Sequence, residues 1–302
     1  IGVEVAPSAP GALVREPVVV VRGAPGPAPL PTSVPSRATR IALAGCGVVG
    51  GGLLDQLTTD PRVDLVGVLV RDPGRVRHPA PDAGLLVREP DALLERRPDL
   101  VIDVLSDARA GLDLTRAALS RGVSVVSAYK QAVGPHVVEL RALAGSNRAN
   151  LSCSAAVGCG TPMIETLDRA LGHAPVARVE AVLNGTVNYL LNQLSDGADF
   201  IGALSAARAA GFAEEDASAD LSGADAAAKL GILSTLAFGA PTPLDTVDPL
   251  DPAAPPTGGF RQLAVSDGRS ASISLTPIDD PLFAELPGER NALRVTCVDG
   301  RV

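Results

Sequence analysis

The chain has 302 residues, which is enough for two domains of ordinary size. Apolar residues make up 46% of the sequence and aromatic residues only 2%, so Val, Leu, Ile and Ala must fill a substantial core. The formal net charge of −8 argues against nucleic acid as the main partner, because phosphate binding requires a basic surface, and no apolar run approaches the roughly 18 residues of a membrane span.

The first part of the chain changes character at about residue 40. Residues 1–40 are rich in proline, which prevents regular helix, so we expect an extension outside the main fold. An apolar strand, a glycine turn and a helix are predicted to follow. Strands that alternate with helices predict a Rossmann-type parallel sheet, an α/β domain over residues 41–153. Its further elements are predicted to be strands at 63–72, 99–107 and 123–128 and a helix at 112–122.

A second domain of α+β type is predicted over residues 154–302. A strand at 177–185 ends in an Asn-Gly turn signal, and Ser222 is a candidate N-cap for a helix at 222–238. The Pro-, Asp- and Gly-rich segment 240–259 is expected to be a loop. The remaining elements are predicted to be helices at 161–172 and 187–197 and short strands at 271–278 and 292–298.

The glycine turn has the spacing G-x-G-x-x-G, at Gly45, Gly47 and Gly50. Because it follows a strand and opens a helix, it predicts dinucleotide binding by residues 41–153. The phosphates would then meet the helix N-terminus at Val48 and Val49. The alternative is a merely structural glycine turn.

The cofactor's ribose is expected to lie at the end of the second strand. An acid there favours NAD, and an arginine favours the 2′-phosphate of NADP. Arg71 is followed closely by Arg75 and Arg77, so NADP is favoured and NAD remains the alternative. An ordinary solvated loop would carry the same charges.

Only two of the 26 Lys and Arg residues are lysines, Lys130 and Lys229. Lys229 lies four residues after Asp225 on one helix face, and Glu214 and Asp220 lie just upstream. The plainest interpretation is a surface ion pair worth about 0.3–0.5 kcal/mol. The helix is mostly apolar, however, and a lysine can exchange a proton when desolvated, which an arginine cannot. Lys130 follows the fourth predicted strand, at the edge of the sheet where ligands bind.

The cysteines and histidines are scattered without metal-ligand spacing. We therefore expect the four cysteines to be thiols in a reducing compartment. No signal peptide is recognisable, so the expected location is the cytoplasm.

Several motifs together resemble the homoserine dehydrogenase family: "GCGVVGGGL", "SAYK", "VLNGTVNYLL" and above all "GFAEEDASADLSGADAAAKLGIL". The resemblance runs from about residue 40 to the end of the chain. It implies NAD(P)-dependent reduction of L-aspartate 4-semialdehyde to L-homoserine, by a nucleotide domain joined to a substrate-binding and dimerisation domain.

The resemblance also implies site residues. Lys229 matches the lysine assigned to proton transfer, and Lys130 matches the lysine beside the nicotinamide. Acids that bind the substrate, particularly its amino group, match Glu214, Asp220 and Asp225, and further substrate contacts match Gly185 and Thr186. We therefore predict Lys229, Lys130 and Asp225 as catalytic residues. The predicted cofactor contacts are Gly45, Gly47, Val48, Val49, Gly50, Arg71, Ser106 and Lys130.

The chain departs from the family pattern in places. Ser106 and Asp107 stand where the family usually has two glycines after the third strand. Ser154 replaces a glutamate that helps to bind a monovalent cation, which argues against a metal site. If a cation binds, the resemblance places it against the main chain of Val157, Cys159 and Thr161. The family also normally continues past residue 302, so the resemblance implies a short form that lacks the C-terminal segment and any regulatory domain.

Three functional classes follow. The first is a homoserine dehydrogenase, acting as a homodimer on a small-molecule substrate without nucleic acid or membrane. The second is a related oxidoreductase acting on another amino-acid semialdehyde. The third is an inactive cofactor-binding homologue.

Overall fold

The computed structural model describes residues 37–158, 161–300 and 302, so most of the expected N-terminal extension lies outside the described residues. The described chain divides into two compact units, an N-terminal unit up to Ala156 and a C-terminal unit from Val157 onward. No helix in these ranges combines the length and apolar character that a bilayer crossing requires.

The N-terminal unit is built on a sheet of six parallel strands in the order β3-β2-β1-β4-β5-β6. This is the Rossmann strand order, in which the chain reverses direction across the sheet between β1 and β4. The strands are β1 (Thr39–Ala44), β2 (Val63–Leu69), β3 (Leu86–Val87), β4 (Leu100–Asp103), β5 (Ser124–Ser127) and β6 (Leu151–Ser152).

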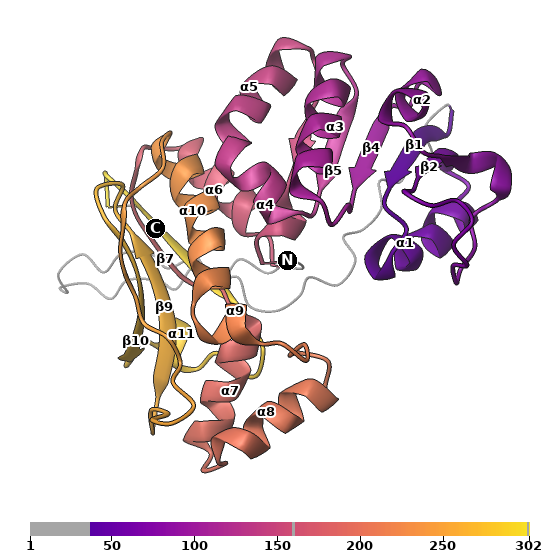
Figure 1. Ribbon diagram of the computed structural model, residues 1–302. Helices are drawn as coiled ribbons and strands as arrows, with labels where there is room; N and C mark the ends of the chain where they lie inside the picture. The colour runs from indigo at the N-terminus through magenta and orange to yellow at the C-terminus, as the bar shows by residue number, and fades with distance from the viewer. Residues whose placement is uncertain (1–36, 159–160, 301) are drawn as a thin grey trace. The chain divides into compact units, whose positions relative to one another are not determined.

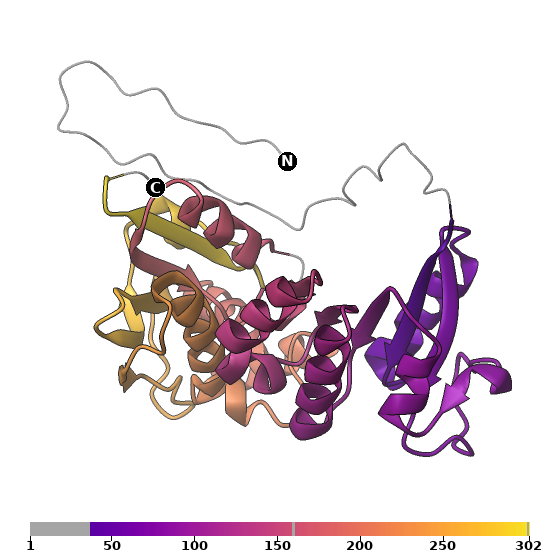
Figure 2. The same ribbon diagram turned by 90° about the horizontal axis from the view of Figure 1, so that it is seen from above.

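Helices cover this sheet because its central strands are apolar on both faces. Ala42, Leu43, Ala44, Val68 and Val101 are fully buried. Figures 1 and 2 show α3 and α5 lying beside each other along the sheet. The helices are α1 (Val48–Thr59), α2 (Pro90–Glu95), α3 (Ala108–Ser120), α4 (Lys130–Val133) and α5 (Val137–Ser146), with short 3-10 turns at Ala83–Leu85, Gly134–His136 and Ser154–Ala156.

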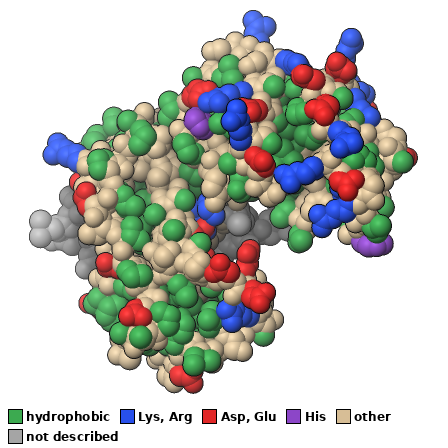
Figure 3. Space-filling model, viewed as in Figure 1, with side chains coloured by type: hydrophobic (Ala, Val, Ile, Leu, Met, Phe, Trp, Pro, Cys, Tyr) green, Lys and Arg blue, Asp and Glu red, His purple; other side chains and the backbone are tan. Residues whose placement is uncertain are grey.

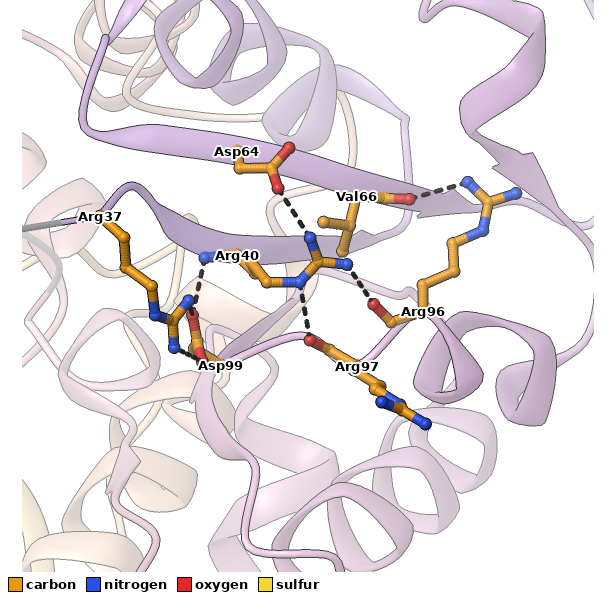
Figure 4. Close-up of polar contacts among 7 residues, drawn as sticks. All are labelled: Arg37, Arg40, Asp64, Val66, Arg96, Arg97 and Asp99. Atoms are coloured by element: carbon orange, nitrogen blue, oxygen red, sulfur yellow. Dashed lines mark hydrogen bonds and ion pairs between the residues drawn. The ribbon is translucent and has the colours of Figure 1, made fainter.

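Arginines hold together the edge of the sheet where the strands begin (Figure 4). The guanidinium of Arg40 donates to a carboxylate oxygen of Asp64 on β2, at 2.9 Å, and to the carbonyl oxygens of Arg96 and Arg97 after α2. Asp99, just before β4, accepts from the main-chain N–H of Arg40 and from the side chain of Arg37. This network joins β1, β2 and β4 at the edge opposite to their carboxyl ends.

The C-terminal unit has a mixed five-stranded sheet in the order β11-β7-β9-β10-β8, in which only β8 and β10 pair in parallel. In Figure 1, α10 runs along β7 and β9, and α7 pairs with α8. The strands are β7 (Val176–Val182), β8 (Leu244–Val247), β9 (Phe260–Ser266), β10 (Ala271–Pro277) and β11 (Ala292–Cys297). The helices are α6 (Met163–Leu171), α7 (Gly185–Ser195), α8 (Phe200–Ala209), α9 (Ser218–Leu221), α10 (Ala224–Phe238) and α11 (Pro281–Ala284).

The predicted fold class is confirmed: a Rossmann-type parallel sheet accompanies an α+β unit. Three local predictions are wrong. Asn184-Gly185 is not a hairpin turn but the start of α7, and Asn184 caps that helix. The N-cap of α10 is Gly223, not Ser222. The segment 240–259 is not all loop, because it contains β8.

Candidate active site

The glycine turn of the N-terminal unit has the geometry that a dinucleotide loop requires. Gly45 has φ +99°, and a Cβ there would lie 2.8 Å from the carbonyl oxygen of Val104. A Cβ on Gly50 would clash with the carbonyl oxygen of Gly45, so only glycine lets α1 pack this closely. By contrast, a Cβ on Gly47 would meet nothing within 4 Å. The loop is therefore tight where glycine permits packing and open where a phosphate would approach the backbone.

The N-terminus of α1 is left open in a way that suits an anion. Its N-cap, Gly47, supplies no side-chain hydrogen bond, and its first turn carries no acid. By contrast, α3, α7 and α8 are each capped by an Asp or Asn side chain. Val48 and Val49 at the start of α1 are exposed, at 96% and 59%. The free N–H groups and positive end of the helix dipole are thus available to phosphate.

Arginines follow the carboxyl end of β2, where a ribose would lie. The side chain of Arg71 is 89% exposed, and its guanidinium lies 4.0 Å from the carboxylate of Asp107. Asp72 uses a carboxylate oxygen to accept the N–H of Gly74, at 2.9 Å. Arg77 is bound to main-chain oxygens of Asp72 and Arg75. The acid at this position is thus engaged in a local turn, while Arg71 extends into solvent.

The loops after β4 and β5 carry the other predicted cofactor residues. Ser106 lies between the end of β4 and α3, whose N-cap is Asp107. The carboxylate of Asp107 accepts the N–H of Ala110 at 3.0 Å, which gives the departure from the family's paired glycines a structural role. Lys130 begins α4, three residues beyond the end of β5.

In the C-terminal unit, a side-chain network joins a lysine to two carboxylates. Lys229 and Asp225 lie four residues apart on α10, with Nζ 2.7 Å from Oδ2. The ammonium also donates to the carbonyl oxygen of Leu183, at 3.0 Å. The amide of Asn184 donates to Asp225 at 3.0 Å and to Asp220 at 2.8 Å. Two acids and a lysine from α9 and α10 are thus held at the first turn of α7.

Burial distinguishes this network from a surface ion pair. The Lys229 and Asp225 side chains are only 16% and 11% exposed, and Asn184 is 3% exposed. A buried pair is costly unless other groups satisfy it, and here the Leu183 carbonyl and the Asn184 amide do so. Of the three N–H bonds of the ammonium, contacts among the described residues account for two. A further acceptor, such as a carbonyl oxygen, could take the third.

Glu214 is not part of this network among the described contacts. It is exposed on the segment between α8 and α9, where its main-chain oxygen accepts from Arg208. Figure 3 shows acidic side chains gathered over this segment. Asp216 nearby accepts the N–H of Ser218, which holds the pKa of the carboxyl below its ordinary value. The segment thus presents carboxylates to solvent.

Gly185 and Thr186 hold this part of the fold together. A Cβ on Gly185 would lie 2.6 Å from the carbonyl oxygen of Glu289, so the segment after α11 can approach α7 only at a glycine. The Thr186 hydroxyl donates to the carbonyl oxygen of Phe212, at 2.6 Å. Its proton is therefore engaged, although its oxygen can still accept. Both residues link α7 to neighbouring loops.

The expected cation ligands are only partly described. Val157 is fully buried and Thr161 is described, whereas Cys159 lies outside the described residues. We assign no ion to this segment. Sequence reasoning missed Asn184, whose side chain makes the central contacts of the acid and lysine network. The signal was its place directly before Gly185 at a strand–helix junction, which favours an N-cap as readily as a hairpin turn.

Comparison with known proteins agrees with this geometry. A family model described as "Homoserine dehydrogenase, NAD binding domain" matches residues 45–153, and one described as "Homoserine dehydrogenase" matches residues 162–254. Among solved structures, a hyperthermophilic archaeal homoserine dehydrogenase in complex with NADPH is similar with a TM-score of 0.73 and 25% identity. The match covers 85% of this chain and 88% of that one.

Curated relatives give the same result over different lengths. A homoserine dehydrogenase of Corynebacterium glutamicum is 34% identical over 220 residues, covering 69% of this chain and 49% of the relative. The chain thus spans about half the length of that protein. A homoserine dehydrogenase of Sulfurisphaera tokodaii is 31% identical over 208 residues, covering 66% of this chain and 68% of the relative. The chain therefore belongs to the homoserine dehydrogenase family.

Proposed function

We propose that this protein catalyses the NAD(P)-dependent reduction of L-aspartate 4-semialdehyde to L-homoserine. The observation that carries the proposal is the partly buried network of Lys229, Asp225, Asn184 and Asp220. It offers an ammonium to a carbonyl oxygen and carboxylates to an amino group, and aspartate semialdehyde carries both of those groups. The open glycine turn and uncapped α1 support a cofactor site in the same chain.

We assign the cofactor to the N-terminal unit, with NADPH preferred and NADH as the alternative. Gly45, Gly47 and Gly50 would hold the pyrophosphate with the main chain of Val48 and Val49. Arg71 would meet the 2′-phosphate, while Ser106 and Lys130 would lie near the nicotinamide. Bound NADPH would supply the hydride.

The substrate would be held by the C-terminal unit. Asp220 and Glu214 bind its ammonium, with Gly185 and Thr186 as further contacts. Lys229 donates an N–H to the carbonyl oxygen and gives it a proton as negative charge develops there. Asp225 keeps that lysine in place and stabilises its charge.

Domain roles, assembly and location are also part of the proposal. Residues 41–153 would bind the cofactor, and residues 154–302 would bind the substrate and form a homodimer. The dimer can be tested by light scattering of the purified chain. A cytoplasmic location is proposed as suited to an enzyme of amino-acid biosynthesis.

The experiment is a titration of the purified chain with NADPH, followed by addition of aspartate semialdehyde while NADPH absorbance is recorded. Binding followed by oxidation of NADPH supports the proposal. Binding without turnover would instead indicate an inactive cofactor-binding homologue. Turnover only with a different semialdehyde would indicate a related oxidoreductase that acts on another amino-acid semialdehyde.

Two glycine substitutions locate the cofactor. Gly47→Ala places a methyl group where the protein leaves open space, so the chain should fold while NADPH binding weakens about tenfold or more. Gly52→Ala is the matched control, because a Cβ there also meets nothing within 4 Å and the residue lies further along α1. Equal NADPH affinity in both variants would contradict the assigned phosphate site.

A further inference from the structure

Asp103, the last residue of β4, is a fully buried carboxyl group to which the proposed mechanism gives no task. One carboxylate oxygen accepts the N–H of Leu105 at 3.1 Å, and the other accepts the hydroxyl of Ser127 at 3.0 Å. Its main-chain oxygen accepts the N–H of Ala128, also at 3.0 Å. A single residue therefore holds both the segment after β4 and the end of β5.

A carboxyl group in a core destabilises the folded state unless neighbouring groups compensate for its loss of hydration. Burial raises the pKa of Asp103, while the N–H of Leu105 and the hydroxyl of Ser127 oppose that rise. Among the ion pairs of the described residues, none includes Asp103. Val101, two residues earlier on β4, is an equally buried apolar residue. A strand end that needed only packing would be served better by such a side chain.

Helix α3 has a glycine where it packs against this carboxyl group. A Cβ on Gly111, in the first turns of α3, would lie 3.0 Å and 3.5 Å from the two carboxylate oxygens of Asp103. Glycine lets the helix lie directly against the carboxyl group. The positive end of the α3 dipole partly offsets the cost of burying it.

Hydrogen bonds carry the link on to the predicted cofactor residues. The Ser127 hydroxyl oxygen also accepts the N–H of Tyr129, at 3.4 Å, and Tyr129 immediately precedes Lys130. On the other side, Leu105 immediately precedes Ser106. The main-chain segments after β4 and β5, which Asp103 holds by hydrogen bonds, therefore lead directly into Ser106 and Lys130, the two residues assigned to the nicotinamide.

We infer that Asp103 is a positioning residue for the cofactor, holding the loops after β4 and β5 so that Ser106 and Lys130 keep their places around the nicotinamide. This inference rests on the proposed function. It assigns Asp103 no contact with substrate or cofactor, and it predicts an effect on cofactor handling separate from substrate handling.

The test compares NADPH affinity in three variants. Asp103→Ala removes both side-chain hydrogen bonds and should raise the Kd and KM for NADPH about tenfold, with the KM for the semialdehyde changed less than about twofold. Asp103→Asn should recover most of the affinity, because an amide can accept from Leu105 and donate to Ser127. Ser127→Ala keeps the carboxyl group and should weaken NADPH binding about threefold, so the inference stays testable if Asp103→Ala does not fold.

Thr115→Val is the matched control. Thr115 is a fully buried residue of α3, and its hydroxyl has no hydrogen-bond partner among the described residues. Its loss should leave NADPH affinity unchanged. Unchanged NADPH affinity in Asp103→Ala and Ser127→Ala, or an equal rise in both KM values, would overturn the inference alone. Failure of the unmodified chain to bind NADPH would overturn the proposed function itself, and the inference with it.

Discussion

Replacing Asn184 with serine separates two tasks of one amide group. Asn184 caps α7 through its Oδ1, which accepts the N–H of Val187 at 2.8 Å, and it holds Asp220 and Asp225 through its Nδ2. Serine is as good an N-cap as asparagine, so the cap should survive. Its side chain is too short to reach the two carboxylates, so those hydrogen bonds should be lost.

The size of the effect follows from the contacts. A hydrogen bond to a charged group contributes about 1.5–3 kcal/mol, so two set a scale of about 3 kcal/mol or more. Water can replace part of this, because Asp225 keeps 11% of its side-chain exposure. We therefore expect a loss of about 1.5–3 kcal/mol in the energy that holds the acids, and a rise of about 10–100-fold in the KM for aspartate semialdehyde.

Steady-state kinetics and urea unfolding together test this reasoning. Asn184→Ala should raise the KM as much as Asn184→Ser does, and should also lose about 1 kcal/mol more stability because the cap is gone. The KM for NADPH should stay near its original value in both variants. A serine variant with the original KM for the semialdehyde would show that the amide does not organise the acids.

Three other variants test separate parts of the structure. Lys229→Arg keeps the positive charge but removes a group that can give up a proton, so turnover should fall about 100-fold or more with little change in melting temperature. Turnover near the original value would show that Lys229 forms only a structural ion pair. Arg261→Met should lower the free energy of unfolding in urea by about 3 kcal/mol. The buried guanidinium of Arg261 donates to the carbonyl oxygens of Phe283, Ala284 and Leu286, and these hydrogen bonds would be lost. The same change at exposed Arg290 is the control and should have almost no effect. Asp99→Asn should lower the free energy of unfolding by about 0.5–1 kcal/mol at neutral pH. Because Arg37 lowers the pKa of Asp99, the stabilisation by this carboxylate is complete above the ordinary carboxyl pKa and decreases as the pH falls. A loss of stability in the variant that is as large in acid as at neutral pH would contradict this.

The pattern of the N-terminal unit was readable from the sequence because its signals are local. A buried parallel strand is a continuous apolar run, and β2 and β5 lie within the predicted segments. The glycine turn also combines local signals, a strand, spaced glycines and a helix. Strand lengths were less predictable: β4 ends at Asp103, whereas the apolar pattern extended the strand to residue 107.

The errors in the C-terminal unit arise from contacts between distant segments. β8 lies in a Pro- and Asp-rich stretch and forms only because it pairs with β10. Gly223 rather than Ser222 is the N-cap of α10, because the chain there has φ +77° and a Cβ would lie 2.7 Å from the side chain of Val247. Such close approaches leave no periodic signal in the sequence.

The candidate site was predictable in its charged members but not in the group that joins them. Two scarce lysines and a cluster of acids stand out in an arginine-rich chain. Asn184 does not stand out, because its importance depends on three hydrogen bonds made at once to segments up to 41 residues away.

The arginine network at the start of the parallel strands has a consequence for how this protein can change by mutation. Arg40 joins the strands by hydrogen bonds at their amino ends, while Arg71 and the glycine turn lie at their carboxyl ends. Mutations that exchange one nicotinamide cofactor for another can therefore accumulate at the carboxyl ends of the strands without loosening the amino ends. Natural variation or laboratory selection for cofactor choice should carry little penalty in thermal tolerance.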